Sequence, residues 1–283
     1  MMFALKTRAL DTLDSVYLKV MARPDLPPYT LRCHVGPAIE YEQLPAEYIA
    51  YFKLLAGLRM TDAILDVGCG TGRFASQLLG RPNFFRGTYR GFDIDTRAIA
   101  WARAHIESTE ADLHFDRVDL FNEHYNPQGT TRAEDFVFPY ADESFDFAFA
   151  MSVFTHLPPA TSANYLQQIA RVLKRGSRAV VSFVLLDTDV SQLSEPALTR
   201  LYDGVLVANG LAAGEPRGRV YACDGYATLT PATPAIVTFY DEQRVREMVK
   251  DTALEIEAIH YGSWSRADGG PAFQDLVVLR RPT

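Results

Sequence analysis

Three glycines at alternate positions form the pattern in this chain with the clearest chemical meaning. Residues 65–74 read LDVGCGTGRF and place Gly68, Gly70 and Gly72 between a short apolar run and a helical pattern, with Asp66 ahead of them. Glycine inside a regular element costs roughly 0.5–1 kcal/mol relative to alanine. Three glycines in register therefore predict that the backbone passes very close to a ligand. A glycine loop between a strand and a helix typically holds a nucleotide against the helix N-terminus.

A carboxylate is present where such a nucleotide would need one. Asp93, in GFDID, ends the next apolar run and lies 21 residues beyond Gly72. Nucleotide-binding α/β folds carry an acid at this point, where it binds a pair of ribose hydroxyls. The dinucleotide fingerprint is G-x-G-x-x-G, whereas this chain has D-x-G-x-G-x-G. The glycines and the acid together predict a nucleotide site whose type differs from that fingerprint.

Short apolar runs and helical patterns alternate through the middle of the chain. We expect strands at 63–67, 89–94, 113–120, 145–153 and 178–186, and helices at 73–80, 96–108 and 161–176. This alternation predicts a parallel sheet with helices on both faces, which binds ligands beyond the carboxyl ends of its strands. Asp95 is the expected N-cap of the second helix. The third helix is expected to hold Lys174 and Arg175 in its last turn, with Gly176 beyond its end.

The two ends of the chain depart from this alternation. The first 22 residues or so are weakly helical, residues 23–45 carry five prolines and predict an irregular arm, and residues 46–58 predict a helix. At the other end, a helix is expected at 241–253, followed by apolar runs at 254–261 and 273–281. No helical pattern separates these two runs, so they should pair as an antiparallel hairpin at the edge of the sheet.

The predicted fold class is α/β, a Rossmann-like doubly wound sheet that is mostly parallel. A chain of 283 residues is compatible with one domain, because α/β domains of roughly 250 residues are common. We expect a single domain over residues 1–283 with four parts: an N-terminal helical arm at 1–58, a cofactor-binding core at 59–187, a lid-like insertion at 188–238, and a C-terminal helix and hairpin at 239–283.

Composition excludes several classes of protein. The net charge of −7 argues against a nucleic acid as the main partner, since nucleic-acid binders usually carry a basic face. Three widely spaced cysteines without a CxxC predict neither a disulfide framework nor a zinc site. No apolar run reaches the roughly 18 residues of a membrane span, and Asp11 and Asp14 do not fit a signal peptide. We therefore expect a cytoplasmic protein; the sequence does not predict its oligomeric state.

Four segments resemble successive motifs of the class I S-adenosylmethionine-dependent methyltransferases. They read ILDVGCGTGRFASQLL, YRGFDID, FPYADESFDFAFAMSVFTHLP and IARVLKRGSRAVVSF, within residues 62–186. The resemblance implies that S-adenosylmethionine is the cofactor and S-adenosylhomocysteine the product. It also implies the cofactor-binding residues: Asp66, Gly68, Cys69, Gly70, Gly72 and Arg73 at the methionine moiety, Asp93 and Ile94 at the ribose, Asp119 and Leu120 at the adenine, and Met151 and Ser152 near the methyl group. The link at 120–135 is longer than in the family, which leaves the adenine contacts open.

The atom that accepts the methyl group is expected to be an oxygen. Methyltransferases acting on nucleobase amino groups resemble one another in an Asn/Asp-Pro-Pro-aromatic run after the fourth strand, where this chain reads MSVFTHLPP. A hydroxyl on a sugar, glycolipid or natural product fits best, with nitrogen or carbon of a small metabolite as alternatives. Cys69 could be mistaken for a nucleophile, but a small residue filling a tight corner is the simpler interpretation.

A hydroxyl acceptor needs a group that takes its proton. His156 follows the fourth strand, and a neutral histidine can act as a general base near pH 7. The same histidine could instead only hold its loop together. Asp187, His260 and Trp264 are candidates to line the acceptor pocket, although each could equally be an ordinary rim residue. Asp187 and Asp189 are the acids that could hold a metal ion. Because two acids in an exposed loop are usually only solvated, we predict no metal.

Two other functions remain open. A nicotinamide-dependent oxidoreductase would use the glycine loop for a pyrophosphate, but the chain lacks the last glycine of that fingerprint. A non-catalytic relative that binds the cofactor and serves as a partner or scaffold would keep the loop and Asp93. The favoured prediction is a methyltransferase whose partner is a small-molecule acceptor.

Overall fold

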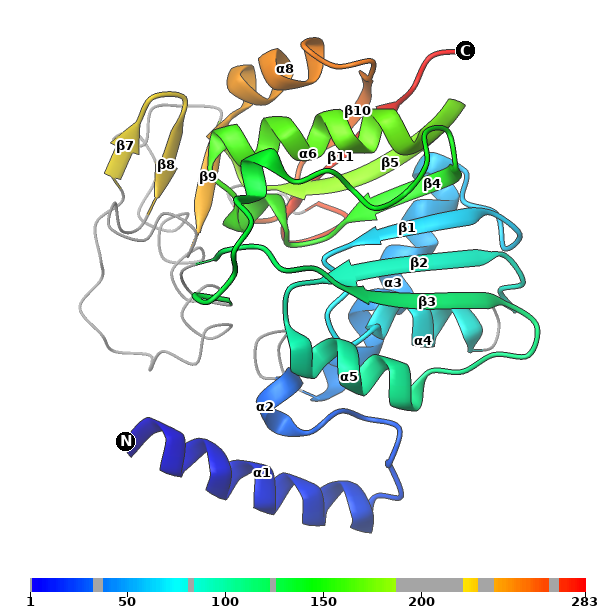
Figure 1. Ribbon diagram of the computed structural model, residues 1–283, viewed down its shortest axis with the longest axis vertical. Coiled ribbons are helices and arrows are strands. Elements are labelled where there is room, and N and C mark those ends of the chain that lie inside the picture. The colour runs from blue at the N-terminus through cyan, green and yellow to red at the C-terminus, as the bar shows by residue number, and fades with distance from the viewer. Residues whose placement is uncertain are drawn as a thin grey trace.

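The computed structural model describes residues 2–32, 38–80, 84–122, 126–186, 221–228, 237–264 and 270–283 (Figure 1). For residues 2–9, 38–40 and 221–222 the description covers the backbone alone. The predicted Asp187 and most of the predicted insertion at 188–238 lie outside the described residues.

A seven-stranded sheet forms the centre of the molecule, with the strand order β10-β11-β5-β4-β1-β2-β3. Its strands are β1 (Ala63–Val67), β2 (Thr88–Asp93), β3 (Asp112–Arg117), β4 (Phe145–Ala150), β5 (Leu173–Phe183), β10 (Glu255–His260) and β11 (Asp275–Arg280). The strands from β3 to β5 pair in parallel, while β11 is antiparallel to both β5 and β10. The predicted α/β class and C-terminal hairpin are confirmed. The hairpin was predicted at the edge of the sheet. In the structure β11, which is antiparallel to both neighbours, lies inside the sheet, and β10 forms the edge.

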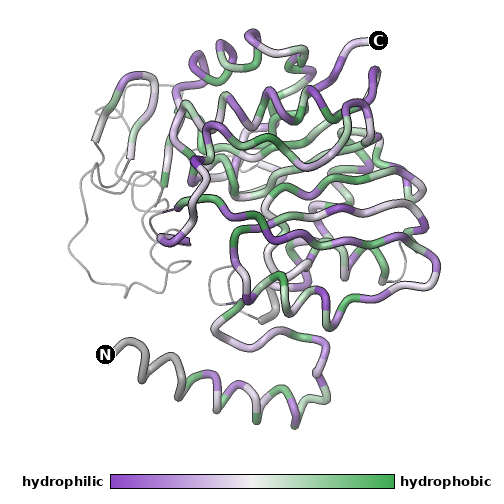
Figure 2. The backbone as a smooth tube through the Cα atoms, in the orientation of Figure 1, coloured by the Kyte–Doolittle hydropathy of each residue, from purple (hydrophilic) through white to green (hydrophobic). Residues whose placement is uncertain are grey.

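Helices cover both faces of this sheet, as the alternating pattern predicts (Figure 1). One face packs against α6 (Pro159–Val172) and α8 (Glu242–Lys250), and the other against α3 (Ala38–Ala56), α4 (Arg73–Leu79) and α5 (Thr96–His105). Neighbouring residues of β4 divide between the two cores: Phe147 and Phe149 pack on the α3 side, and Ala148 on the α6 side. The central strands are accordingly hydrophobic along most of their length (Figure 2). Asp95 caps α5, as expected, by accepting hydrogen bonds from the amides of Arg97 and Ala98.

The N-terminal arm is more helical than its prolines indicate. After α1 (Met2–Val20) and the short α2 (Tyr29–Arg32), α3 begins at Ala38 and runs through Pro45, so the irregular arm predicted up to residue 45 is wrong in its last part. Proline inside a helix removes one backbone hydrogen bond. Buried tyrosines on both sides of Pro45, Tyr41 and Tyr48, pack α3 against the rest of the protein. Tertiary packing here outweighs a local preference.

The boundary between α6 and β5 also differs from the prediction. The helix ends at Val172, and Lys174 and Arg175 belong to β5 rather than to a last helical turn. Leu173 pairs with Phe145 of β4, and the Lys174 ammonium lies 2.8 Å from a carboxylate oxygen of Asp146. Strand pairing thus starts directly after the helix, because the buried Leu173 already belongs to the sheet.

A second, four-stranded sheet was not predicted. Its order is β6-β9-β8-β7, formed by β6 (Leu185–Leu186), β9 (Thr238–Asp241), β8 (Tyr226–Thr228) and β7 (Tyr221–Cys223). In Figure 1 it lies to the left, on the side toward which the arrowheads of β1, β2 and β3 point. None of the helices described is long and apolar enough to cross a membrane.

Candidate active site

A cavity of about 280 Å³ opens at the carboxyl ends of β1, β2 and β4. It is lined by the glycine loop, by the residues that follow β2 and β4, and by single side chains from the N-terminal arm and α6. These lining residues are Leu31, Asp66, Val67, Gly68, Cys69, Gly70, Thr71, Arg73, Phe74, Phe92, Asp93, Ile94, Asp95, Ala98, Asn122, Met151, Ser152, Val153, His156, Leu157 and Tyr165. The cavity lies where an open α/β sheet binds its ligand.

The three glycines of the loop have different structural roles. All have positive φ, at 76° for Gly68, 53° for Gly70 and 75° for Gly72. A Cβ atom at Gly68 would lie 2.6 Å from Val153, and one at Gly72 would lie 2.5 Å from Ile106. At Gly70 a Cβ atom would meet nothing within 4 Å. Gly68 and Gly72 are therefore needed for packing, while Gly70 leaves open the space that a ligand would use.

This difference gives a matched pair of variants. Both substitutions place a branched side chain on a left-handed backbone, which costs stability in each variant. Gly70→Val should still fold but lose S-adenosylmethionine binding by at least about tenfold, because its side chain enters the cavity. Gly72→Val should lose roughly 1–3 kcal/mol more stability, because it also overpacks the corner against Ile106. Thermal unfolding and titration calorimetry on both variants check this. The assignment fails if Gly70→Val is the variant that unfolds.

Cys69 belongs to the packed part of the loop. It is buried, and a Cβ atom at Gly91 of β2 would lie 2.7 Å from the Cys69 Cβ. Burial raises the pKa of the Cys69 thiol well above its usual value, so the thiolate is disfavoured. This geometry supports the interpretation of Cys69 as a small residue in a tight corner.

Asp93 connects β2 to the glycine loop. Its carboxylate accepts hydrogen bonds from the amide of Gly70, at 2.8 Å, and from the amide of Asp95, at 2.9 Å. Burial raises the pKa of Asp93, and the two backbone hydrogen bonds act in the opposite direction. The carboxylate is held rigidly at the cavity wall and keeps lone pairs with which to accept further hydrogen bonds.

Asp66 is the most deeply buried acid of the cavity, with 2% of its surface exposed. Tyr89 of β2 donates its hydroxyl to the Asp66 carboxyl. Burial raises the pKa of Asp66 to about 7, while the Tyr89 hydrogen bond and the nearby Arg73 guanidinium lower it. Arg73 itself keeps a buried Nη1 that has no hydrogen-bond partner within the described part of the chain. One acid and one unsatisfied cation thus lie side by side at the glycine loop.

The pKa of Asp66 predicts how a cationic ligand binds. Below pH 7 the carboxyl is protonated in the folded protein, so a ligand amine must displace that proton. The affinity for S-adenosylmethionine should rise with pH, by at most about tenfold per unit, and level off above pH 7. The stability of the ligand-free protein should fall as the pH rises from about 4 to 7, because the unfolded carboxyl ionises near 4.

Calorimetry from pH 5.5 to 8, with Asp66→Asn as the control, tests this dependence. The variant should bind more weakly and show no slope below pH 7. An unchanged slope in Asp66→Asn would assign the dependence to another group.

The loop after β4 is fixed at both ends. Ser152 follows Met151 and donates its amide to the Ser182 hydroxyl at 2.7 Å. At the other end Tyr240 of β9 donates its hydroxyl to the Leu157 carbonyl at 2.7 Å. Between them His156, in a short 3₁₀ turn (Phe154–His156), lines the cavity. The geometry permits His156 to reach a molecule in the cavity.

Several predicted residues lie elsewhere. Asp119 is directed to its own loop, where it accepts hydrogen bonds from Thr130 and Arg117 that lower its pKa. Leu120 is buried in the main core. Neither residue is among those that line the cavity. The Leu120–Thr131 bridge holds them in their own loop. This geometry does not support a place for Asp119 and Leu120 at the adenine.

The expected acceptor residues of the hairpin also lie outside the cavity lining. Trp264 is 1% exposed, and its indole N–H donates to Asp275 at 2.6 Å, so it holds the hairpin loop together. His260 pairs with Leu276 within the hairpin. Asp187 falls outside the described residues. The cavity lining therefore does not include His260 or Trp264, which were candidates for the acceptor pocket, and it does not test Asp187.

Other residues of the cavity were not identified from the sequence. Tyr165 comes from α6, Leu31 from α2, and Asn122 from the loop after β3. Each reaches the cavity from an element distant in the sequence, and none belongs to a motif. Tyr165 was predicted only as part of a helix, and nothing in its sequence context indicated the cavity.

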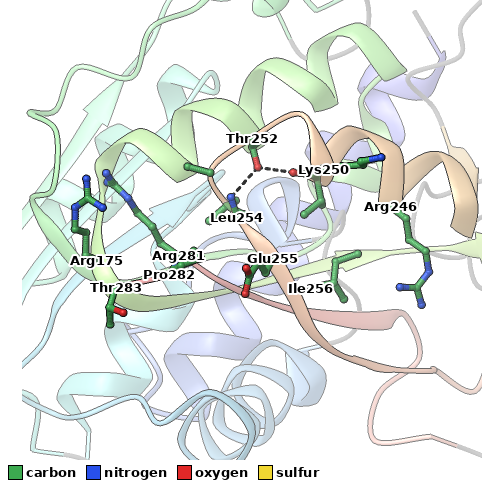
Figure 3. Close-up of a pocket in the computed structure, with 12 residues that line it drawn as sticks. Arg175, Arg246, Lys250, Thr252, Leu254, Glu255, Ile256, Arg281, Pro282 and Thr283 are labelled. Atoms are coloured by element: carbon green, nitrogen blue, oxygen red, sulfur yellow. Dashed lines mark hydrogen bonds between the residues drawn. The ribbon is translucent and has the colours of Figure 1, made fainter.

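A larger hollow, of about 640 Å³, lies at the opposite edge of the sheet (Figure 3). Arg175 and Arg281 lie at one end of it and Arg246 at the other (Figure 3). Arg281 pairs with Glu143 at 2.8 Å, and Arg246 pairs with Glu242 at 2.6 Å. These arginines already have acidic partners and do not point to one common position. The hollow therefore does not form an anion-binding site.

Comparison with known proteins supports the site at the glycine loop. Residues 65–181, which include the loop, Asp93 and the loop after β4, match the family model described as a methyltransferase domain. Residues 65–181 are a methyltransferase domain. The predicted resemblance to S-adenosylmethionine-dependent methyltransferases is confirmed over these residues.

The methyltransferase domain also accounts for the similarity to individual proteins. The O-methyltransferase cnsE of Penicillium expansum is 31% identical over 46% of this chain and 42% of its own length. The O-methyltransferase resE of Aspergillus sclerotiorum is 34% identical over 44% and 40%. These alignments span less than half of the relatives' length. The solved CcbJ methyltransferase of Streptomyces caelestis shares the fold with a TM-score of 0.51 at 15% identity, over 88% of this chain and 92% of its own.

Proposed function

We propose that this protein transfers a methyl group from S-adenosylmethionine to a hydroxyl of a small molecule. The observation that carries the proposal is the cavity at the glycine loop, in which Asp66, Arg73 and Asp93 surround open space beside Gly70. Methylation of nitrogen or carbon on a small metabolite is the alternative. A sugar, glycolipid or natural product is the proposed acceptor class.

The polar groups of the cavity fit the three polar parts of the cofactor. The unsatisfied Nη1 of Arg73 suits the carboxylate of the methionine moiety, and the ionised form of Asp66 suits its ammonium group. Asp93, fixed by Gly70 and Asp95, suits the ribose diol. These assignments give each charged side chain of the cavity a partner of opposite charge or a pair of donors.

When bound, S-adenosylmethionine supplies a methyl group that is already activated by the sulfonium. The protein then has to align the acceptor and remove its proton. Alignment alone can contribute several kcal/mol to catalysis. His156 is the proposed general base, since it lines the cavity on the loop that also carries Ser152. Its ring nitrogen would take the hydroxyl proton of the acceptor.

Two observations favour oxygen over nitrogen. The relatives cnsE and resE carry the name O-methyltransferase. The loop after β4 reads MSVFTHLPP and lacks the Asn/Asp-Pro-Pro-aromatic run, whose oxygen atoms accept hydrogen bonds from the amino group to be methylated.

The remaining parts of the organisation are also proposals. The lid predicted at 188–238 falls mostly outside the described residues; its described part, β7 and β8, lies beyond the carboxyl ends of the strands, where we propose that it covers the acceptor (Figure 1). A single domain over residues 1–283, without nucleic acid as a partner, is part of the same proposal. A cytoplasmic location is proposed from the cysteine pattern alone.

One experiment tests the function as a whole. Titration of the purified protein with S-adenosylmethionine and with NAD should show binding of the first only. Methyl transfer from labelled S-adenosylmethionine into a cell-extract metabolite pool should then label a small molecule. Binding of NAD without S-adenosylmethionine would favour an oxidoreductase, and binding without transfer would favour a non-catalytic relative.

A further inference from the structure

Ser152 has a backbone conformation that its side chain does not favour. Its φ is 57°, in the left-handed region, where residues with a side chain are uncommon. The Ser182 hydroxyl, which is fully buried in β5, holds the Ser152 amide in this conformation at 2.7 Å. Strained residues persist where the surrounding structure fixes them, and they gather at functional sites. In consequence Ser152 lies at the cavity wall immediately after β4.

The Ser152 hydroxyl has a partner from a distant part of the chain, Gln274, which lies just before β11 and 122 residues away in the sequence. Both polar atoms of the Gln274 side-chain amide lie within hydrogen-bond distance of Ser152 Oγ: Nε2 donates to Oγ at 3.0 Å, and Oγ can donate to Oε1 at 3.2 Å. While Nε2 donates to Oγ, the serine proton can turn from Oε1 to a ligand oxygen, so a ligand competes with this one 3.2 Å contact for the donor.

Gln274 is itself held on a rigid base. The next residue, Asp275, is 1% exposed and accepts hydrogen bonds from the amides of Leu185 and Gly262 and from the Trp264 indole. The two amide bonds are 2.7 and 2.8 Å long, and the indole bond is 2.6 Å. This buried carboxylate ties together β11, the start of β6 and the hairpin loop, and so fixes the point from which Gln274 extends.

We propose that Ser152, oriented by Gln274, binds a second oxygen of the acceptor molecule. The acceptor would then carry two oxygen functions, one that loses its proton to His156 and one that accepts a hydrogen bond from Ser152. Between these groups the cavity presents apolar side chains, Val153 and Leu157. A diol or hydroxy-carbonyl compound on an apolar frame fits this arrangement. The inference rests on the proposed methyl transfer and names its acceptor class.

Small phenols test the acceptor class directly. Catechol, resorcinol, hydroquinone and phenol are offered with labelled S-adenosylmethionine to the parent and to Ser152→Ala, Gln274→Leu and Gln274→Glu. The parent should have a KM for its best diol about tenfold below that for phenol, as one additional hydrogen bond provides. Ser152→Ala and Gln274→Leu should remove this preference by raising the diol KM. For Gln274→Leu, whose altered side chain is not part of the cavity lining, the kcat should stay within about threefold and the cofactor affinity should not change.

Gln274→Glu tests whether the orientation of the Ser152 hydroxyl, rather than the volume of the side chain at position 274, produces the diol preference. The carboxylate keeps the volume of the amide but can only accept a hydrogen bond, so Ser152 must donate to it and no longer to the acceptor. It should lose the diol preference as fully as Gln274→Leu does. Gln243→Leu, the same change on the exposed surface of α8, is the matched control and should behave like the parent.

Three results would overturn the inference. A parent that methylates phenol as well as any diol has no second-oxygen site. A parent that binds the cofactor but methylates none of the four probes would count against the inference in the same way. Variants that lose cofactor affinity or phenol turnover as much as diol turnover would make the Ser152–Gln274 pair merely structural. Failure of the proposed function looks different, because S-adenosylmethionine then does not bind the parent, or no extract metabolite is labelled.

Discussion

Asp93→Ala should weaken the binding of S-adenosylmethionine by a hundredfold or more. The carboxylate is expected to hold two ribose hydroxyls, and hydrogen bonds to charged groups contribute roughly 1.5–3 kcal/mol each. The variant also releases the Gly70 amide, which Asp93 holds at 2.8 Å. The glycine loop therefore loses a restraint in addition to the ligand contacts. Titration calorimetry with S-adenosylhomocysteine measures the effect without turnover.

Asp112→Ala provides the matched control for this variant. Asp112 begins β3, the strand next to β2, and lies beside Thr88 at the end of the sheet opposite to Asp93, where it pairs with Arg90 at 2.7 Å. The same chemical change there should leave the affinity within about twofold, since exposed pairs contribute at most about 1 kcal/mol. Equal affinities for Asp93→Ala and the parent would show that another group binds the ribose.

His156→Ala should lower turnover by roughly 10²–10⁴-fold while leaving cofactor binding intact. The residue lines the cavity on the loop after β4, away from the glycine loop that is expected to hold the methionine moiety. Removing a general base slows proton removal from the acceptor but does not touch the cofactor contacts. Labelled methyl transfer, together with calorimetry on the same preparation, measures both quantities.

The pH dependence distinguishes a base from a structural histidine. As a base, His156 must be neutral, so the parent's rate should fall at acidic pH, where a protonated imidazole cannot accept the acceptor's proton. The variant should lack that limb. If His156 only holds the loop, His156→Ala should lose stability and cofactor affinity together and keep the parent's pH profile. A stable variant with nearly full turnover would exclude His156 from the mechanism.

The sequence predicted the centre of the fold well, for a physical reason. The runs at β1, β4 and the second half of β5 are mostly buried and therefore mostly apolar, and the glycine loop connects the first of them to a helix. These signals are local. The N-terminal arm was predicted less well, because α3 continues through Pro45 only with the support of packing by Tyr41 and Tyr48. That packing is not encoded in any short window.

The same division applies to the site. Gly70 and Asp93 could be identified because spacing along one βαβ unit places them together. Trp264 was a candidate for the acceptor pocket because of its place beside the hairpin turn, and the sequence did not indicate that its indole donates to the buried Asp275. Gln274 could not be identified at all. Its contact with Ser152 depends on β11 lying next to β5, which is a property of the whole sheet.

The second sheet has a consequence for how enzymes of this design can be altered. β9 follows the predicted insertion directly, and its Tyr240 supports the loop that carries His156. The proposed recognition of the acceptor by the insertion and the proposed removal of its proton by His156 would thus both depend on this strand. A foreign insertion grafted to change the acceptor should therefore rejoin this chain before Val237, so that β9 keeps its register with Leu185 and Leu186. Grafts that replace β9 would exchange specificity and disable the chemistry in one step.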